Sequence, residues 1–371
     1  METLYPRLVL DALSTVRYPG NGKDIVSLGM VEDDMRIDGK KVEFSLIFDK
    51  PTDPFIKSIV KAAETAILTH ISPEVDIKGN ISVKTRQQMP AQAEHVNPLP
   101  GVKNIIGISS GKGGVGKSTV ASNLAVALAR EGYKVGLLDA DIFGPSMPKM
   151  FGVEKEPLYI HKVDGRDLII PVERYGVKLL SIGFVIDPDS AAVWRGSMAS
   201  NALKQLITDA DWGELDYFLI DMPPGTSDIH LTLVQTLAIS GIVIVSTPQE
   251  VALADARKGI SMFTGEKINV PVLGIVENMA WFTPEAHPEE RYYIFGRDGA
   301  TRLAKDMDVP LLAQIPVVCR ICDRGDSGEP IALDDSVTSM AFMHLAHEVI
   351  EAVDKRNNEL PPTLKVNVTR K

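Results

Sequence analysis

Short apolar runs alternate with amphipathic stretches along most of the chain after residue 100. These runs predict strands buried on both faces, because a strand with one wetted face would alternate apolar and polar positions. The runs are Asn104–Ser109, Lys134–Asp139, Lys178–Gly183, Tyr217–Asp221, Gly241–Thr247, Val272–Glu277 and Leu311–Ile315. Helices are predicted between them, the clearest at Ser118–Arg130, Met198–Ala210 and Ser336–Asp354. The alternation indicates an α/β fold, a mostly parallel sheet covered by helices on both faces.

The N-terminal part of the chain has a different pattern. Leu8–Val16 and Asp53–Leu68 repeat apolar residues at helical spacing, whereas Lys41–Phe48 and Val75–Lys84 alternate as strands do. The polar, proline-containing stretch that follows lacks periodicity and predicts a linker. The predicted organisation is a small α+β domain over 1–85, a linker over 86–100, the large α/β domain over 101–355 and a loose tail over 356–371.

Composition narrows the functional classes. The formal net charge is −10, which argues against binding to a nucleic-acid phosphate backbone as the main task. No apolar run reaches the roughly 18 residues of a membrane span, and the first residues lack a signal-peptide pattern. The chain has two cysteines, Cys319 and Cys322, too few for a disulfide framework, so we expect a protein of the reducing cytoplasm.

The first predicted strand of the large domain runs into a glycine-rich loop. Its sequence GKGGVGKS satisfies the phosphate-loop pattern G-x-x-x-x-G-K-[ST] between a strand and a helix. Glycines let successive backbone N–H groups point at a phosphate at the start of the helix. Lys117 adds positive charge and Ser118 offers a hydroxyl to Mg²⁺. The predicted ATP-binding residues are Gly111, Lys112, Gly113, Gly114, Val115, Gly116, Lys117, Ser118 and Thr119.

Aspartates end two of the other predicted strands. Asp139 and Asp141 follow one strand, and Asp221 ends another just before a Pro-Pro-Gly turn. Ligands bind at the carboxyl edge of such sheets, so Asp221 is the expected Mg²⁺ carboxylate, directly or through water. A single strand-end aspartate often serves only as a helix cap. Three beside a phosphate loop favour the functional interpretation.

Lys112 departs from an ordinary phosphate loop. The form GKGGVGKST resembles the deviant Walker A class, which includes septum-site and chromosome-partition ATPases and the nitrogenase iron protein. In that class the first lysine reaches across a homodimer interface to the partner's nucleotide, in the manner of an arginine finger. The alternative is that Lys112 is only a second phosphate-attracting charge.

Within that class, the large domain resembles the Mrp/ApbC family of iron–sulfur cluster carriers. The similarity runs in order over nearly all of residues 101–350. It rests on DADIFGPSMP, VWRGSM, DWGELDYFLIDMPPGTSD, STPQEVALAD, VENM and GDSGEP, at Asp139–Pro148, Val193–Met198, Asp211–Asp228, Ser246–Asp255, Val276–Met279 and Gly325–Pro330.

The resemblance implies roles for individual residues. Lys112, Lys117 and Asp141 would be catalytic, with Asp141 orienting the attacking water. Asp139 would support the Mg²⁺ held by Ser118 and Asp221. Asn278 and the loop after Pro316 would contact the adenine base. The turn Trp194-Arg195-Gly196 is either functional or a structural surface turn.

The N-terminal segment resembles the small iron–sulfur assembly domain that precedes many Mrp proteins, most clearly at Gly22–Met30 (GKDIVSLGM). The combination implies a homodimeric ATPase with slow hydrolysis. Its implied partners are apo iron–sulfur proteins and assembly scaffold proteins, with no membrane or nucleic acid.

Two departures from the family pattern concern cysteine. Family members usually hold a C-x-x-C pair between the Asn-Met strand and the Phe-Gly turn, but the interval 280–294 (AWFTPEAHPEERYYI) contains no cysteine. The N-terminal domain commonly has a cysteine before the proline that opens its second helix, where this chain has Asp53. The usual ligand positions are therefore empty.

Cys319 and Cys322 form the chain's own C-x-x-C pair. Two such pairs in a dimer supply four thiolates, enough for one bridging [4Fe–4S] cluster. Packing cysteines or chance spacing are the alternative, since free cysteine behaves as a small hydrophobe. His287, Glu285 and Glu289 offer a different donor set, but hard carboxylates suit iron–sulfur chemistry poorly.

Two functions follow from these observations. The first is an ATP-hydrolysing carrier that binds iron–sulfur clusters and transfers them to apo-proteins. The alternative is an ATP-switched assembly or positioning factor of the partition or septum-site type that holds no cluster. Positioning would call for an amphipathic C-terminal helix or a basic surface. The tail Leu360–Lys371 offers no such helix, and the net charge of the chain is acidic.

Overall fold

The structure is a computed structural model that describes residues 4–19, 22–32, 34–48, 53–85, 98–163, 165–185, 196–284, 286–287, 289–363 and 365–366. It comprises two compact units, Met1–Val96 and Asn97–Lys371. Most of the predicted linker lies outside the described residues. Among those described, no helix is both long and apolar enough to cross a membrane.

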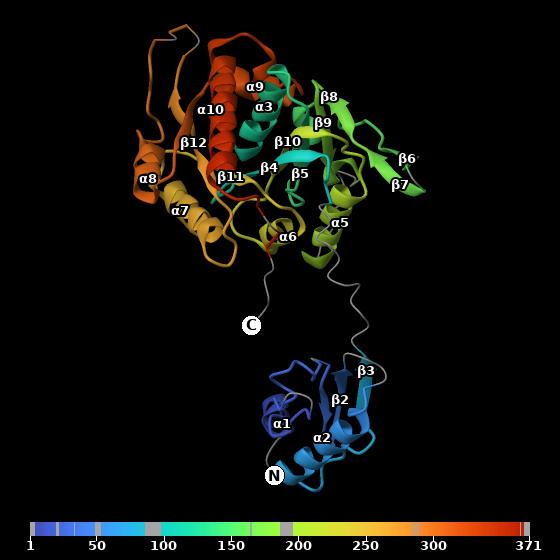
Figure 1. Ribbon diagram of the computed structural model, residues 1–371. Coiled ribbons are helices and arrows are strands. Elements are labelled where there is room, and N and C mark those ends of the chain that lie inside the picture. The colour runs from blue at the N-terminus through green and yellow to red at the C-terminus, as the bar shows by residue number, and fades with distance from the viewer. Residues whose placement is uncertain are drawn as a thin grey trace. The chain divides into compact units, whose positions relative to one another are not determined.

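The first unit packs two helices against a small sheet (Figure 1). The sheet order is β1-β2-β3, with β2 antiparallel to β1 and parallel to β3. The elements are α1 (Pro6–Leu13), β1 (Arg36–Asp38), β2 (Lys41–Phe48), α2 (Ile56–His70) and β3 (Ile81–Thr85). The strand predicted from Val75 begins only at Ile81, because the chain turns at Gly79, whose φ of 80° suits glycine.

An eight-stranded sheet forms the centre of the second unit. Its order is β13-β12-β11-β4-β10-β5-β9-β8, and every neighbouring pair is parallel except β8 with β9. The prediction of a mostly parallel sheet is confirmed. The strands are β4 (Val102–Ser109), β5 (Val135–Asp139), β8 (Val172–Arg174), β9 (Val177–Ser181), β10 (Leu215–Asp221), β11 (Gly241–Ser246), β12 (Val272–Phe282) and β13 (Leu311–Val317).

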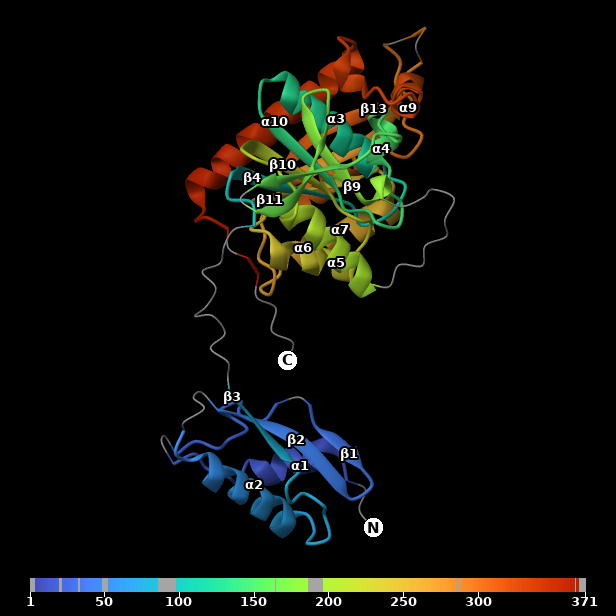
Figure 2. The same ribbon diagram turned by 90° about the vertical axis from the view of Figure 1, so that its right-hand side faces the viewer.

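Helices cover both faces of this sheet, as the buried apolar runs predict (Figure 2). Helices α3 and α10 pack on one face, and α5 to α8 pack on the other. The helices are α3 (Lys117–Arg130), α4 (Met147–Met150), α5 (Gly196–Thr208), α6 (Asp228–Thr236), α7 (Glu250–Thr264), α8 (Gly299–Met307), α9 (Cys319–Asp326) and α10 (Val337–Glu359), with short 3-10 turns η1 (Ile182–Phe184) and η2 (Ile331–Leu333).

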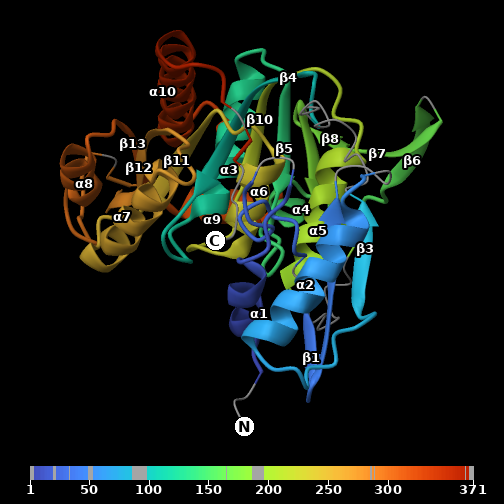
Figure 3. The same ribbon diagram turned by 60° about the horizontal axis from the view of Figure 1, so that its bottom comes forward.

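A two-stranded hairpin, β6 (Tyr159–Val163) with β7 (Arg166–Ile170), lies beyond the β8 edge of the sheet, on the side away from β12 and β13 (Figure 3). The apolar-run pattern did not predict it, because its strands mix charged and apolar residues and remain largely exposed. The strand expected through Gly183 ends at Ser181. The Ser181 hydroxyl accepts a hydrogen bond from Gly183 N at 3.0 Å and starts η1.

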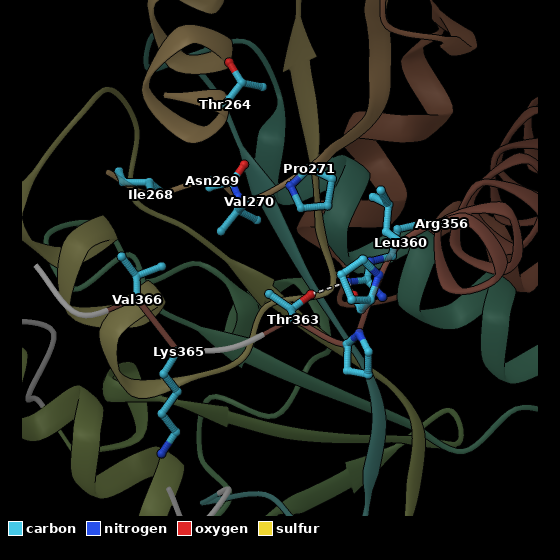
Figure 4. A pocket seen from close by; sticks show the side chains of 12 residues that line it. Thr264, Ile268, Asn269, Val270, Pro271, Arg356, Leu360, Thr363, Lys365 and Val366 are labelled. Carbon is cyan, nitrogen blue, oxygen red and sulfur yellow. Dashed lines mark hydrogen bonds between the residues drawn. The ribbon is translucent and has the colours of Figure 1, made fainter. Parts of the chain in front are cut away.

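The described part of the C-terminal tail packs against the rest of the second unit, contrary to the loose tail expected. Arg356, near the end of α10, donates hydrogen bonds to Pro361 O and Thr363 Oγ1, both at 2.6 Å. Val366 N donates to Val234 O at 3.0 Å. Figure 4 shows this segment beside Asn269–Pro271, where it lines a hollow at the amino-terminal edge of the sheet.

Candidate functional site

The glycine-rich loop lies at the carboxyl end of β4, near the middle of the sheet, and leads directly into α3. Close packing requires two of its glycines. A Cβ on Gly111 would lie 2.1 Å from the backbone carbon of Asp255, and one on Gly116 would lie 2.2 Å from Asn278 Nδ2. Gly116 also has a φ of 80°. The loop therefore keeps its shape only without side chains at these positions.

Lys117 and Ser118 meet Asp221 at the start of α3. Lys117 Nζ donates to Asp221 Oδ1, and Ser118 Oγ donates to Asp221 Oδ2, both at 2.6 Å. The Lys117 side chain is 6% exposed and that of Asp221 is fully buried. Burial raises the pKa of the Asp221 carboxyl, and the Lys117 charge opposes this increase. Cation, hydroxyl and carboxylate thus converge as the sequence predicts.

Asp139 lies beside Asp221, because the two are register partners on neighbouring parallel strands. Its carboxylate accepts hydrogen bonds from Ser181 Oγ at 2.9 Å and from the backbone N–H groups of Ser146, Met147 and Asp141 at 3.1–3.2 Å. Burial, and secondly the Asp221 charge, raise the pKa of Asp139. With these donors its carboxylate fixes the 140–147 loop, which makes Asp139 a positioning residue.

Asp141 is the acidic residue nearest to solvent in this cluster. Its Oδ2 lies 3.8 Å from Lys117 Nζ, and its side chain is 14% exposed. Burial raises the pKa of this carboxyl, while Lys117 lowers it. Lys112 is exposed, and no ion pair of its ammonium is found among the residues that the structure describes. Its side chain is therefore free to reach a group outside the loop.

A pocket of about 400 Å³ adjoins the first turn of α3. Asn278 and Pro316, the residues predicted to contact the base, both line it, because β12 and β13 pair with Asn278 opposite Ile315. Asn278 Nδ2 donates to Val115 O at 2.8 Å, so this side chain also supports the phosphate loop. The Ser146 hydroxyl lines the same pocket and is buried without a hydrogen-bond partner in the described part of the chain. Nothing in the sequence singled out Ser146.

Cys319 and Cys322 lie on the first turn of α9, and both are exposed. Cys322 lines the pocket just described. Its thiol lies 3.7 Å from Asp326 Oδ2, and the Asp326 charge raises its pKa. The structure thus brings one thiol of the pair to the pocket beside the phosphate loop.

The interval that lacks the usual cysteines begins in the last residues of β12 and continues into the segment after it, whose described residues are mostly exposed. His287, Glu289 and Glu290 lie together there, with one potential ligand atom of each within 4.8 Å of the others. Glu285 lies outside the described residues, as do Trp194 and Arg195, so their predicted roles stay predictions.

The turn after Asp221 is tied to the phosphate loop and to a buried histidine. Gly225 N donates to Ser110 O at 2.8 Å. His230 is fully buried, and its Nδ1 accepts a hydrogen bond from Ser227 N at 3.1 Å, which caps α6. Burial lowers the pKa of His230 to about 4. The neutral ring therefore holds the turn, a role that the sequence did not reveal.

His230 is expected to make stability depend on pH. The unfolded chain has an ordinary histidine pKa of 6.5 and binds a proton that the folded protein resists. The contribution of His230 to stability is therefore full above pH 6.5 and is lost as the pH drops toward 4. The loss amounts to about 3 kcal/mol. We expect His230→Gln to flatten this part of the curve. Urea unfolding followed by tryptophan fluorescence tests it, because all three tryptophans lie in the second unit. Parallel pH curves for both proteins would contradict the assignment.

Two family models match the chain. Residues 101–350 match the model described as NUBPL iron-transfer P-loop NTPase. Residues 7–78 match the model described as iron-sulfur cluster assembly protein.

One relative aligns with nearly the whole chain, and two others align with about two thirds of it. An iron-sulfur cluster carrier protein from Synechocystis sp. is 41% identical over 344 residues, which is 92% of this chain and 96% of that protein. The iron-sulfur cluster transfer protein NUBPL of Mus musculus is 44% identical over 258 residues, 68% of this chain and 78% of that protein. A nucleotide-binding protein from Archaeoglobus fulgidus, solved in complex with ADP, is 40% identical with a TM-score of 0.55, covering 64% of this chain and 91% of that one.

Proposed function

The chain belongs to the family of iron-transfer P-loop NTPases, and on that premise we propose that it is an ATP-dependent carrier of iron–sulfur clusters. It binds a cluster as cargo and delivers it to apo-proteins in the cytoplasm. The proposal rests chiefly on one observation: an assembly-type domain and an iron-transfer NTPase domain occur together in one chain, in the same order and over nearly the same length as in a named carrier.

The residues at the loop fit a magnesium nucleotide. No atom lies within 4 Å of where a Cβ on Gly114 would be, so the loop backbone is open there, and the Lys117 ammonium lies at the start of the helix. Ser118 Oγ and Asp221 offer the hard oxygen ligands that Mg²⁺ prefers. Asp139 supports them through the loop that it holds. The ion would neutralise charge on the transferring phosphate.

We assign hydrolysis to a homodimer. Asp141 lies between Lys117 and solvent, where it orients the attacking water. Lys112 is exposed, and we propose that it acts on the partner's nucleotide. Hydrolysis is slow and coupled to cluster or client transfer.

The cargo ligands that the chain offers are Cys319 and Cys322, its only cysteines. Both thiols are exposed on one helical turn, and two copies of the chain supply the four thiolates of a [4Fe–4S] cluster. The N-terminal domain would contact apo-proteins or an assembly scaffold protein. The alternative, an ATP-switched assembly or positioning factor, needs no thiols.

Anaerobic reconstitution with iron and sulfide tests the carrier function. We expect the full-length protein to turn brown and to hold about four irons per dimer. The Cys319→Ser/Cys322→Ser protein should hold none, because no other thiolate is present in the chain. Iron counting and visible absorption measure the result, and transfer to an apo-ferredoxin measures delivery.

Serine at these exposed positions should not disturb folding, so the double variant must still bind ADP like the parent. A parent protein that holds no cluster, with normal ADP binding, would contradict the carrier function and favour the ATP-switched factor. A cluster of equal iron content in the double variant would contradict the assignment of the two thiols.

A further inference from the structure

The pocket beside the phosphate loop has a thiol in its wall. Gly116 and Thr119, at the start of α3, line it together with Asn278. Cys322 and Ile321 of α9 line it as well. The pocket thus joins the start of α3 to the first turn of α9, although these segments are about two hundred residues apart in sequence.

We expect a nucleotide on this loop to place its base in the same pocket. Its phosphates would lie at the N-terminus of α3, where Lys117 meets Asp221, and Gly116 and Thr119 of the same turn line the pocket. The buried, unpartnered hydroxyl of Ser146 gives the pocket a polar group that suits a polar ligand. The solved relative at 40% identity is a complex with ADP.

The free thiol of Cys322 is small, and it is accessible when no base is bound. It is exposed, and Asp326, one turn later on α9, lies 3.7 Å from its sulfur. A hydrogen on sulfur leaves room in the pocket, whereas a larger substituent would occupy the space that a base needs. Cys319 is exposed too, but it is absent from the described residues that line the pocket.

We propose that Cys322 is a modification site built into the base pocket, where a soft electrophile bonded to its sulfur and a nucleotide base exclude each other. This goes beyond cluster delivery, and it holds whether or not the chain carries a cluster. With N-ethylmaleimide as the electrophile, the sulfur adds to the carbon–carbon double bond. The thiol proton ends on the neighbouring carbon, and no group leaves.

Two single-thiol forms of the full-length chain test the proposal. Cys319→Ser leaves Cys322 as the sole thiol, and Cys322→Ser leaves Cys319 as the matched control. Labelling by N-ethylmaleimide is followed by mass spectrometry with and without Mg·ADP. At about 100 times its Kd, an excluding ligand leaves about 1% of sites open, so labelling of Cys322 should slow about a hundredfold. Labelling of Cys319 should change less than about twofold.

The reverse measurement uses the same two proteins after complete labelling. The protein labelled at Cys322 should bind ADP at least about tenfold more weakly than before labelling, and the protein labelled at Cys319 should keep its own affinity. Thermal melting before and after labelling checks that both remain folded. Slowing of Cys322 labelling by less than about tenfold, or unchanged ADP affinity of folded protein labelled there, would overturn the proposal.

Discussion

Replacing Lys117 by alanine is expected to abolish measurable ATP binding, with a loss of affinity of at least about a hundredfold. The lysine is the buried cation at the start of α3, and it is 2.6 Å from Asp221. Without Lys117, no positive charge would offset the repulsion between the phosphates and the Asp221 carboxylate. Truncating one partner of a buried, hydrogen-bonded charge pair typically costs about 2–5 kcal/mol. Isothermal titration with ATP and ADP measures the effect.

The same substitution should lower the free energy of unfolding by about 3 kcal/mol, because it leaves a buried carboxylate unpaired. A second variant separates this from binding. Lys117→Ala/Asp221→Asn removes the unpaired charge and should regain most of the lost stability, yet it should still fail to bind ATP. Affinity close to that of the parent in either variant would overturn the site assignment.

Replacing Lys112 by alanine should have the opposite profile. Nucleotide affinity should stay within about threefold, whereas ATP hydrolysis should fall about a thousandfold, the lower end of the effect of a cation supplied in trans. The structural reason is that Lys112 is exposed on its own loop, while the buried Lys117 contacts the acidic residues of its own subunit. Steady-state phosphate release, measured with titration of ADP on the same sample, distinguishes the two effects.

Mixing two inactive variants tests the action in trans. Lys112→Ala retains Asp141, and Asp141→Asn retains Lys112, so a mixed dimer contains one site with both groups. We expect the mixture to regain up to about a quarter of the parent activity, since half of the dimers are mixed and each has one complete site. No recovery in dimers shown to be mixed would place the role of Lys112 within its own subunit. Equal turnover in Lys112→Ala and parent would remove any catalytic role.

The sequence alone determined the centre of the second unit. Strand β4, the loop and α3 follow from a few consecutive residues, because glycines, one lysine and one serine at set spacing restrict the local backbone to few shapes. The buried parallel strands are equally local in origin. A strand covered on both faces must be apolar along its length, as Ile242–Val245 is.

Other elements were missed because their patterns are weak locally. The β6–β7 hairpin is mostly exposed and has no apolar run to mark it. Helix α7 contains Gly259, which weakens a helix in isolation; packing of Ala256, Ile260 and Phe263 against the core stabilises it. The tail was expected to be loose, but two hydrogen bonds hold it. Arg356 donates to the irregular segment that follows α10, and Val366 donates to a residue far away in the sequence.

The contacts of the individual site residues, and hence their roles, follow only from the tertiary structure. Asp139 and Asp221 both end apolar strands, and the sequence does not show which side chains each carboxylate contacts. In the fold, Asp221 meets Lys117 and Ser118, whereas Asp139 accepts four hydrogen bonds from the following loop and from Ser181. Likewise, the pairing of β12 with β13 brings Asn278 and Cys322 to one pocket. A local motif is specified by neighbours in sequence, but such partnerships depend on strand order, which is set by how the whole core packs.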